Sequence, residues 1–235
     1  MIFKKSDKIQ FVSTVEGLES IEKCLPRPAK HFIPQWFKDI PSSAIGSVKS
    51  CPSFPDYFSQ GYIIPMWTDT LLNYKNNEYS WSGPTGIFPW DVHTDDQFLN
   101  YADAKFNGIE GQFMFKAVSP WRIITPPGWS VLQLPLFYHF NQEWSVLPGV
   151  VDTDIMHQVN QQVLYHGNGK DVRINCGDPF VLYIPFKRSD KLKHEVFYQK
   201  EKHRKLFRTL DLSLNQLFQP TGWYRDRQRN RDKDV

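Results

Sequence analysis

One short motif in the sequence has residue types that could bind a transition metal. His93 and Asp95 are separated by a single residue. With a distant histidine such as His166, they would supply the two imidazoles and one carboxylate that hold non-haem Fe(II) in 2-oxoglutarate-dependent oxygenases. Arg173 or Lys187 would then bind the carboxylate of the 2-oxoglutarate. His-x-Asp is common by chance and lies here among polar residues, so we favour a solvent-exposed loop.

Three ligands of one metal ion must converge on a single point, at about 2 to 2.3 Å for a first-row metal. We expect this convergence to fail, with His93 and His166 more than about 10 Å apart.

A second candidate is the acidic segment Gly149–Asp154, in which Asp152 and Asp154 are separated by one residue. The two carboxylates could form a functional pair, or they could cap a turn through side-chain hydrogen bonds to the backbone. We expect Val146-Leu147 and Val150-Val151 to be buried, leaving Asp152 at the rim of the fold. If Asp152 faced Trp129 or Trp144, it would line an aromatic pocket of the kind that binds small molecules.

The cysteines point away from metal and disulfide chemistry. Cys24, Cys51 and Cys176 are widely spaced and contain no Cys-x-x-Cys pair, which excludes a zinc finger or ribbon. An odd, sparse set of cysteines also predicts no disulfide framework, and hence a reducing compartment. Residues 1–8 lack an apolar signal-peptide region, and no run approaches the roughly 18 apolar residues of a membrane span. We therefore expect a cytoplasmic protein with no membrane partner.

Composition predicts many short strands. Of 235 residues, 15% are aromatic and 17 are proline, which favours β-strands separated by turns. The net charge is +3. Basic residues gather from Lys187 to the end of the chain, but Asp226, Asp232 and Asp234 alternate with them and lower the field. Nucleic acid is therefore not an expected partner.

The pattern of apolar runs and turns predicts a mainly β chain. Turn-bounded runs from Phe113 to Arg188 predict antiparallel strands, while Leu206, Leu210, Leu214 and Leu217 have helical spacing. We expect a single domain over residues 1–235. It would consist of a proline-rich N-terminal wrap with hairpins (1–105), a β core (106–190), a helix (191–219) and a basic tail (220–235).

Several segments resemble an uncharacterised protein family of bacteria and of tailed phages of marine cyanobacteria. They are Thr125–Ser130, Leu147–Asp154, Gly177–Phe180 and Ile184–Arg188, with Ile33–Lys38 and Gly61–Pro65 resembling the phage members in particular. The resemblance covers most of the chain and implies no known activity. It implies a phage-type accessory or virion-associated protein, located in the host cytoplasm or in the virion.

The order of three segments is also similar to that in dUTPases and dCTP deaminases. The segments are Pro126–Trp129, Gly149–Asp154 and Gly177–Phe180. This similarity implies an antiparallel β barrel of the β-clip type, and it favours a pocket position for Asp152. In dUTPases the corresponding carboxylate orders a catalytic water and would act as general base.

The chain departs from the dUTPase pattern at the groups that hold phosphate. Ile155 stands where dUTPases have a tyrosine, and Leu134–Tyr138 stands near the place of their Pro-Arg-Ser-Gly-Leu segment. A glycine-rich C-terminal arm is also lacking. Without these groups the charge of a triphosphate would be poorly held.

Three functions follow from these observations. The first is a non-catalytic accessory or virion-associated protein that binds a small molecule or protein partner, with no cofactor and with homo-oligomerisation open. Its expected ligand-binding residues are Asp152, Asp154, Trp129 and Trp144. The second is an Fe(II)/2-oxoglutarate-dependent oxygenase using His93, Asp95 and His166. The third is a diverged nucleotide hydrolase of the dUTPase type, built around Asp152.

Overall fold

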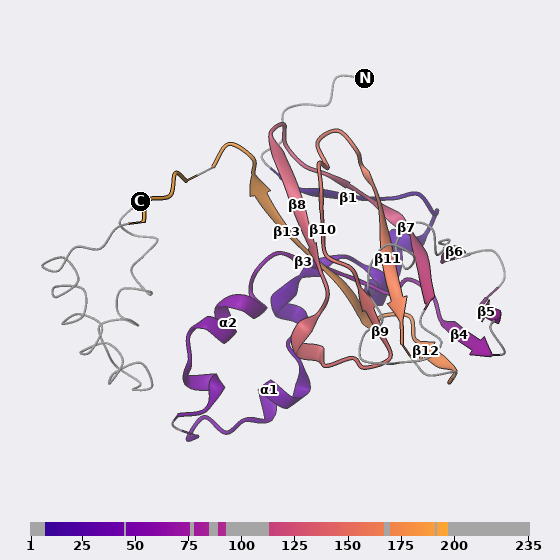
Figure 1. Cartoon of the computed structure of the whole chain (residues 1–235), viewed down its shortest axis with the longest axis horizontal. Coiled ribbons are helices and arrows are strands. Elements are labelled where there is room, and N and C mark those ends of the chain that lie inside the picture. The colour runs from indigo at the N-terminus through magenta and orange to yellow at the C-terminus, as the bar shows by residue number, and fades with distance from the viewer. Residues whose placement is uncertain are drawn as a thin grey trace, which may run out of the picture. The chain divides into compact units, whose positions relative to one another are not determined.

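The computed structural model describes residues 8–44, 46–75, 78–84, 89–92, 113–166, 170–190 and 192–196. The chain divides into two compact units, one formed by residues 1–32 and 61–190 and the other by residues 33–60 and 191–235. All the described strands belong to the first unit. Figure 1 labels most of these strands.

The first unit contains a five-stranded antiparallel sheet centred on a long strand, β7. The sheet order is β1-β7-β11-β9, and β6 also pairs with β7. These strands are β1 (Gln10–Ser13), β6 (Trp90–Val92), β7 (Phe113–Ile124), β9 (Trp144–Val146) and β11 (Gln158–Tyr165). Buried and partly buried residues alternate along most of β11, as expected for a strand with one face on the core.

A second five-stranded antiparallel sheet has the order β10-β8-β13-β3-β2. Its strands are β2 (Arg27–Pro28), β3 (Tyr62–Pro65), β8 (Trp129–Leu134), β10 (Gly149–Val151) and β13 (Pro179–Lys187). The turn before β8 contains Gly128, whose φ of +83° is a conformation that glycine adopts without strain. This turn agrees with the predicted break at Pro126-Pro127-Gly128.

A third, three-stranded sheet joins β12 (Val172–Ile174) to the hairpin of β4 (Thr70–Lys75) and β5 (Glu78–Ser82). The hairpin was expected from the sequence, and its turn residues 76–77 lie outside the described residues. The mainly antiparallel β fold is thus confirmed. The strands between Phe113 and Arg188 are antiparallel as predicted, although they are shared among all three sheets.

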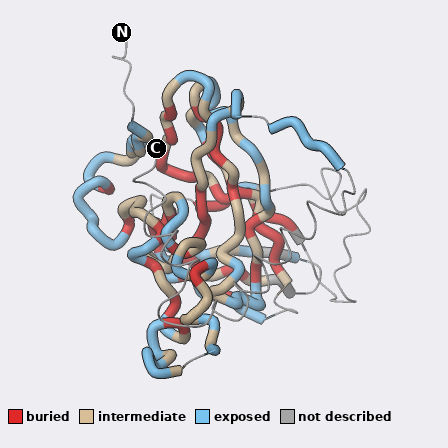
Figure 2. Tube along the Cα trace, turned by 90° about the vertical axis from the view of Figure 1, so that its left-hand side faces the viewer, coloured by how far each residue is buried: buried red, intermediate tan, exposed pale blue. Residues whose placement is uncertain are grey.

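Aromatic side chains fill the core between the sheets. Phe180 on β13 is fully buried, and its ring centroid lies 5.1 Å from that of Trp144, 6.0 Å from Trp67 and 6.1 Å from Trp90. In Figure 2 the buried stretches run along the strands, while the exposed stretches are mostly turns. The high aromatic content is therefore used largely for packing.

A chain of buried hydrogen bonds links the first two sheets. Gln161 on β11 donates from Nε2 to the Tyr183 hydroxyl (2.7 Å). Tyr183 on β13 donates to Oε1 of Gln133 on β8 (2.8 Å), and Nε2 of Gln133 donates to the carbonyl of Leu147 (2.8 Å). All three side chains are buried, so each hydrogen bond offsets a substantial desolvation cost.

Leu147 marks the point where the chain passes from the first sheet to the second. The sequence predicts one strand from Trp144 to Asp152, but the structure has β9 in the first sheet and β10 in the second. Pro148, which lies between them, has no N–H to donate to a strand ladder and so favours a break. β10 is the outermost strand of its sheet. Val150 is therefore 60% exposed, and the prediction that it is buried is wrong.

The second unit is described for residues 33–44, 46–60 and 192–196. It contains two short helices, α1 (Gln35–Asp39) and α2 (Ser53–Phe58), as the proline-bracketed segments indicate. Phe37 is buried, with its ring centroid 6.3 Å from that of Phe54 and 4.8 Å from that of Phe58. Short 3-10 turns in the described part of the chain are Leu18–Ser20, Glu22–Cys24, Ala29–Phe32, Val48–Ser50 and Phe137–His139.

The C-terminal helix expected over residues 191–219 is not seen where the chain is described. Residues 192–196 have no helical structure, and Leu192 and Val196 are almost fully exposed. The leucines whose spacing predicts the helix, Leu206 to Leu217, lie outside the described residues, so the helix itself stays a prediction. The rest of the helix and the basic tail lie outside the described residues.

The first prediction concerns the buried link between the sheets. Replacing Tyr183 with Phe should lower the free energy of unfolding by about 1–3 kcal/mol, since it removes the acceptor of the buried Gln161 Nε2 and the donor to the buried Gln133 Oε1. Urea denaturation measures the loss. Tyr62→Phe is a matched control in the same sheet and should cost less than about 0.5 kcal/mol. Equal losses in the two variants would contradict a structural role for the Tyr183 hydroxyl.

Candidate functional site

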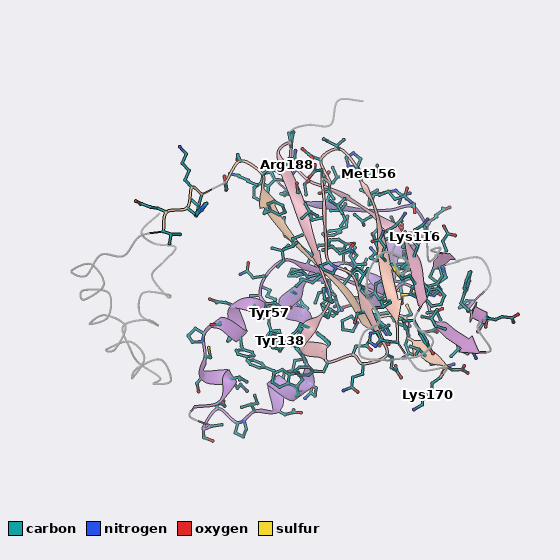
Figure 3. All side chains as sticks on the ribbon, in the orientation of Figure 1. Tyr57, Lys116, Tyr138, Met156, Lys170 and Arg188 are labelled. Atoms are coloured by element: carbon teal, nitrogen blue, oxygen red, sulfur yellow. The ribbon has the colours of Figure 1, made fainter. Side chains whose placement is uncertain are left out.

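The predicted acidic segment lies at one end of the second sheet. β10 and β13 flank β8 on opposite sides. β10 ends at Val151, directly before Asp152. β13 ends at Lys187, opposite Trp129, directly before Arg188. The sheet register therefore brings Asp152 and Arg188 to the same end of β8, where Figure 3 labels Arg188 and the nearby Met156.

Asp154 forms a two-pronged ion pair with Arg188. The guanidinium donates to Oδ1 at 2.8 Å and to Oδ2 at 2.6 Å. The backbone N–H of Gly128 donates to Oδ2 as well, at 2.8 Å. The Asp154 side chain is only 7% exposed. Hydrogen bonding to Arg188 lowers the pKa of Asp154 to about 2, despite the opposing effect of burial. Asp154 therefore braces the turn as a permanent carboxylate.

Asp152 has a different environment from Asp154. The Ser130 hydroxyl donates to its Oδ1 at 2.6 Å, and Arg188 lies 3.3 Å from the same oxygen. Its side chain is 50% exposed, and Oδ2 has no hydrogen-bond partner among the described residues. The repulsion between the two carboxylates is offset by the shared arginine. Asp152 thus lies at the rim, as the sequence predicts, with one oxygen free to accept a proton or a hydrogen bond.

At this turn two carboxylates share one guanidinium, which leaves one negative charge in excess. Arg188 is engaged by both carboxylates and also donates to the Trp129 carbonyl at 3.1 Å. The Lys187 ammonium lies 5.4 Å from the centre of the Trp129 ring. The arginine that could hold a phosphate is already bound to Asp154. The turn is therefore poorly suited to a triphosphate.

The four predicted ligand-binding residues do not form one site. Trp129 lies beside Asp152 and Asp154, at the first residue of β8. Trp144 is buried on β9 and packs on Phe180. It lines a cavity at the opposite end of β8, near the labelled Tyr138 in Figure 3.

This cavity has a volume of about 350 Å³. It is bounded by the loop between β8 and β9, by β9 itself and by the start of β13. We call it the Trp144 cavity. Its lining residues are Pro135, Leu136, Phe137, His139, Phe140, Asn141, Gln142, Trp144, Ser145, Val146 and Pro179. It combines aromatic and aliphatic walls with a few side chains that can hydrogen-bond, which is the usual composition of a small-molecule site.

The Trp144 cavity is uncharged at neutral pH as far as its described lining shows. The lining contains no acidic residue, lysine or arginine. Its one histidine, His139, has a pKa below the ordinary 6.5 because it is partly buried, although a hydrogen bond with the backbone of Phe32 opposes the shift. Asn141 already accepts backbone hydrogen bonds from Glu143 and Trp144. A ligand here would therefore meet hydrogen-bonding groups without a counter-charge.

The proposed iron ligands cannot be brought together from the described residues. His93 and Asp95 lie outside these residues, so the expected separation of His93 from His166 stays a prediction. His166 lies at the end of β11, where its Nε2 is 3.1 Å from the Ser145 hydroxyl. Among described residues, no group of three or more histidine, cysteine or acidic side chains could hold a metal ion. Likewise, no described helix is long and apolar enough to cross a membrane.

Two features of these sites were missed from the sequence. One is the role of Arg188, which only the register of β13 against β8 reveals. The other is the run Phe137-Tyr138-His139-Phe140 after Pro135, which was read as the end of a strand. Four rings in succession beyond a proline could have indicated a surface loop with a ligand-binding wall. Phe140 supports that reading, since its φ of +53° is unusual for a residue other than glycine.

Comparison with known proteins gives only distant similarities. No model of a known protein family matches the chain, and no curated protein matches its sequence. Among solved structures, it is similar to a mutant dUTPase of Staphylococcus bacteriophage 80alpha, with 8% identity over 83% of this chain and 99% of that chain, at a TM-score of 0.38. A mutant dUTPase from phage phi11 of S. aureus has 10% identity, covering 82% and 99%, at a TM-score of 0.37.

The native EIAV dUTPase is also similar, with 8% identity over 60% of this chain and 85% of that chain, at a TM-score of 0.32. Similarity at this level gives no information about a shared activity.

The second prediction separates the two carboxylates by their effect on stability. Asp154→Asn should cost about 1–3 kcal/mol, because it breaks a largely buried charge-assisted pair. Asp152→Asn should cost about 1 kcal/mol or less, because its ion pair is half exposed. Urea denaturation of both variants measures the difference. A larger loss of stability for Asp152→Asn would show that the turn is stabilised by Asp152 and not by Asp154.

The third prediction concerns acid stability. The pKa of Asp154 is about 2 in the folded protein, against an ordinary value of 3.8. As pH falls between these values, the unfolded chain takes up the proton first, so the stability that Asp154 contributes above that range is lost. Urea midpoints should fall steeply from about pH 4 towards pH 2 in the wild type. The fall should be shallower in Asp154→Asn, and parallel curves would refute the assignment.

Proposed function

We propose that the chain is a non-catalytic binding protein that holds a small, neutral and largely apolar molecule in the Trp144 cavity. The observation that supports this most directly is the cavity itself, about 350 Å³ in volume, lined by aromatic rings and without charge in its described lining. This function is the ligand-binding form of the first hypothesis from the sequence. Trp144 remains a proposed ligand-binding residue. The other proposed ligand contacts come from the Phe137–Val146 segment in place of Trp129, Asp152 and Asp154.

The size and polarity of the cavity define the class of ligand. A volume of 350 Å³ is near the lower end of the range for small-molecule sites, roughly 300–1,000 Å³. Burying a charged ligand without a counter-charge is costly, so a nucleoside triphosphate or 2-oxoglutarate would be excluded from this cavity. Phe137, Phe140 and Trp144 offer aromatic faces, while Gln142 and Ser145 offer polar groups. A flat ring system with one or two hydrogen-bonding groups fits these walls.

A diverged nucleotide hydrolase is a second candidate, supported by the half-exposed Asp152 with its free oxygen. The engagement of Arg188 by Asp154 weighs against it. We expect no release of pyrophosphate when purified protein is incubated with dUTP and Mg²⁺. Turnover that disappears in Asp152→Asn while the fold is retained would overturn the non-catalytic assignment.

The oxygenase and virion hypotheses stay proposals that can be tested separately. Stoichiometric iron in purified protein, lost in His93→Ala, would support the oxygenase. Mass spectrometry of purified phage particles would decide whether the protein is virion-associated, a role that rests on the family resemblance. Sedimentation velocity of the purified protein, alone or mixed with a candidate partner, would detect binding of that partner or of a second copy of the chain.

The fourth prediction tests the cavity with a neutral fluorescent probe, N-phenyl-1-naphthylamine. Its fluorescence should rise on binding with a saturable, one-to-one titration. Phe140→Gly removes a ring from the wall at a position whose positive φ suits glycine, so the fold should be retained. Losing this contact should weaken binding by about fivefold or more, equivalent to roughly 1 kcal/mol.

Ile155→Ala is the matched control. Ile155 is also apolar and 75% exposed, but it lies in the turn at the other end of β8. Its variant should bind the probe as the wild type does. Equal weakening in both variants, or no saturable binding to the wild type, would overturn the proposed function.

A further inference from the structure

Cys24 and Cys176 are brought into contact by the fold although 152 positions separate them in the chain. Their sulfur atoms lie 2.8 Å apart, and both cysteines are free thiols in this structure. A covalent disulfide requires a sulfur separation of about 2.05 Å, so only a small movement divides this arrangement from a bond. The widely spaced cysteines in the sequence gave no indication of this pair.

The backbone on each side of the thiol pair is held in place. Cys24 ends the 3-10 turn Glu22–Cys24 and is completely buried. Cys176 lies in the turn between β12 and β13, where its N–H donates to Oδ1 of Asp69 at 2.8 Å. The next residue, Gly177, donates to the Met66 carbonyl at 2.7 Å. Neither thiol can move far from the other without breaking these contacts.

Gly177 also explains why the two turns can approach so closely. Its φ is +97°, and a Cβ added there would lie 3.3 Å from the Cβ of Lys23. Glycine therefore satisfies both the conformation and the close packing of Cys176 against the Glu22–Cys24 turn.

We propose that Cys24 and Cys176 form a redox-active pair that closes to an intramolecular disulfide when the protein meets an oxidised low-molecular-weight disulfide. This site is independent of the Trp144 cavity and of its proposed ligand. Closure would join the N-terminal segment covalently to the junction of β12 and β13, at the edge of the core.

The chemistry proceeds by two thiol–disulfide exchanges. Cys176 is the more exposed thiol, so it loses its proton to solvent and its thiolate attacks one sulfur of oxidised glutathione. One glutathione thiolate leaves, and a mixed disulfide remains on Cys176. Cys24 then loses its proton and attacks the Cys176 sulfur, which releases the second glutathione. The protein gives up two electrons and two protons, and the oxidant becomes two molecules of reduced glutathione.

The order of these steps follows from the burial of Cys24. Burial and the neighbouring Cys176 raise the pKa of the Cys24 thiol to about 12. Little Cys24 thiolate is therefore present at neutral pH, and the second exchange should be the slower one. The mixed disulfide should accumulate first, and its conversion should accelerate as pH rises.

The test is to incubate the full chain with oxidised glutathione, quench with acid and map the products by peptide mass spectrometry. The wild type should yield a peptide pair joined through Cys24 and Cys176, preceded by a glutathione adduct on Cys176. The thermal midpoint of the oxidised protein should rise by about 5 °C or more, because the bond closes a long loop.

Two variants give the test its controls. Cys51→Ser removes the cysteine outside the pair and should behave as the wild type. Cys176→Ser should show neither the joined peptides nor the thermal shift, and its partly exposed position should preserve folding. Absence of the Cys24–Cys176 linkage in the wild type, or oxidation through Cys51 at a similar rate, would overturn the proposal.

Discussion

The buried hydrogen bonds from Gln161 through Tyr183 and Gln133 to the Leu147 carbonyl fix the place where the chain changes sheets. Before that point, β9 belongs to the first sheet and carries Trp144 at the edge of the cavity. After it, β10 belongs to the second sheet and delivers Asp152 to the opposite end of β8. Because the Gln133 amide is desolvated, moving the Leu147 carbonyl away would leave Gln133 Nε2 unpaired in the core. Both candidate sites therefore depend on this one set of bonds.

The two ends of the second sheet have opposite electrostatic character. At the Asp152 end, Arg188 forms ion pairs with both carboxylates, and these ion pairs mainly stabilise the turn. At the Trp144 end, the described cavity lining is uncharged. A ligand gains the most binding free energy where it displaces water from apolar walls without desolvating a charged group. This contrast is the physical basis for assigning ligand binding to the aromatic end.

Much of the fold could be predicted because it depends on local pattern. The segment Gln158–Tyr165 is expected as a strand and Pro126–Gly128 as a turn, and both are seen. The break at Pro148 was missed because the apolar residues on its two sides belong to different faces of the core, a distinction that single-sequence periodicity does not contain. The C-terminal helix was predicted from the spacing of leucines that lie outside the described residues, and the described residues 192–196 before them have no regular structure.

The sites were harder to predict because they depend on contacts between distant strands. The sequence singled out Asp152 and Asp154 as either a functional pair or turn caps, but it contains no sign that Arg188 would reach them from β13. Trp129 and Trp144 were grouped by residue type, whereas they lie near opposite ends of β8, a strand of six residues. The contact between Cys24 and Cys176 was equally hard to predict, because only the assembled sheets bring their two turns together.

According to the proposed function, a small neutral molecule binds in the Trp144 cavity and not at the turn that contains Asp152 and Asp154. The most direct test is a titration of isotope-labelled protein with indole, a neutral planar probe, followed by two-dimensional amide NMR. Binding in the Trp144 cavity should give saturable chemical-shift changes for the amides of Leu136, Phe140 and Ser145. The amide chemical shifts of Trp129, Thr153 and Arg188 should not change. Changes centred on the turn around Asp152, or scattered changes without saturation, would contradict it.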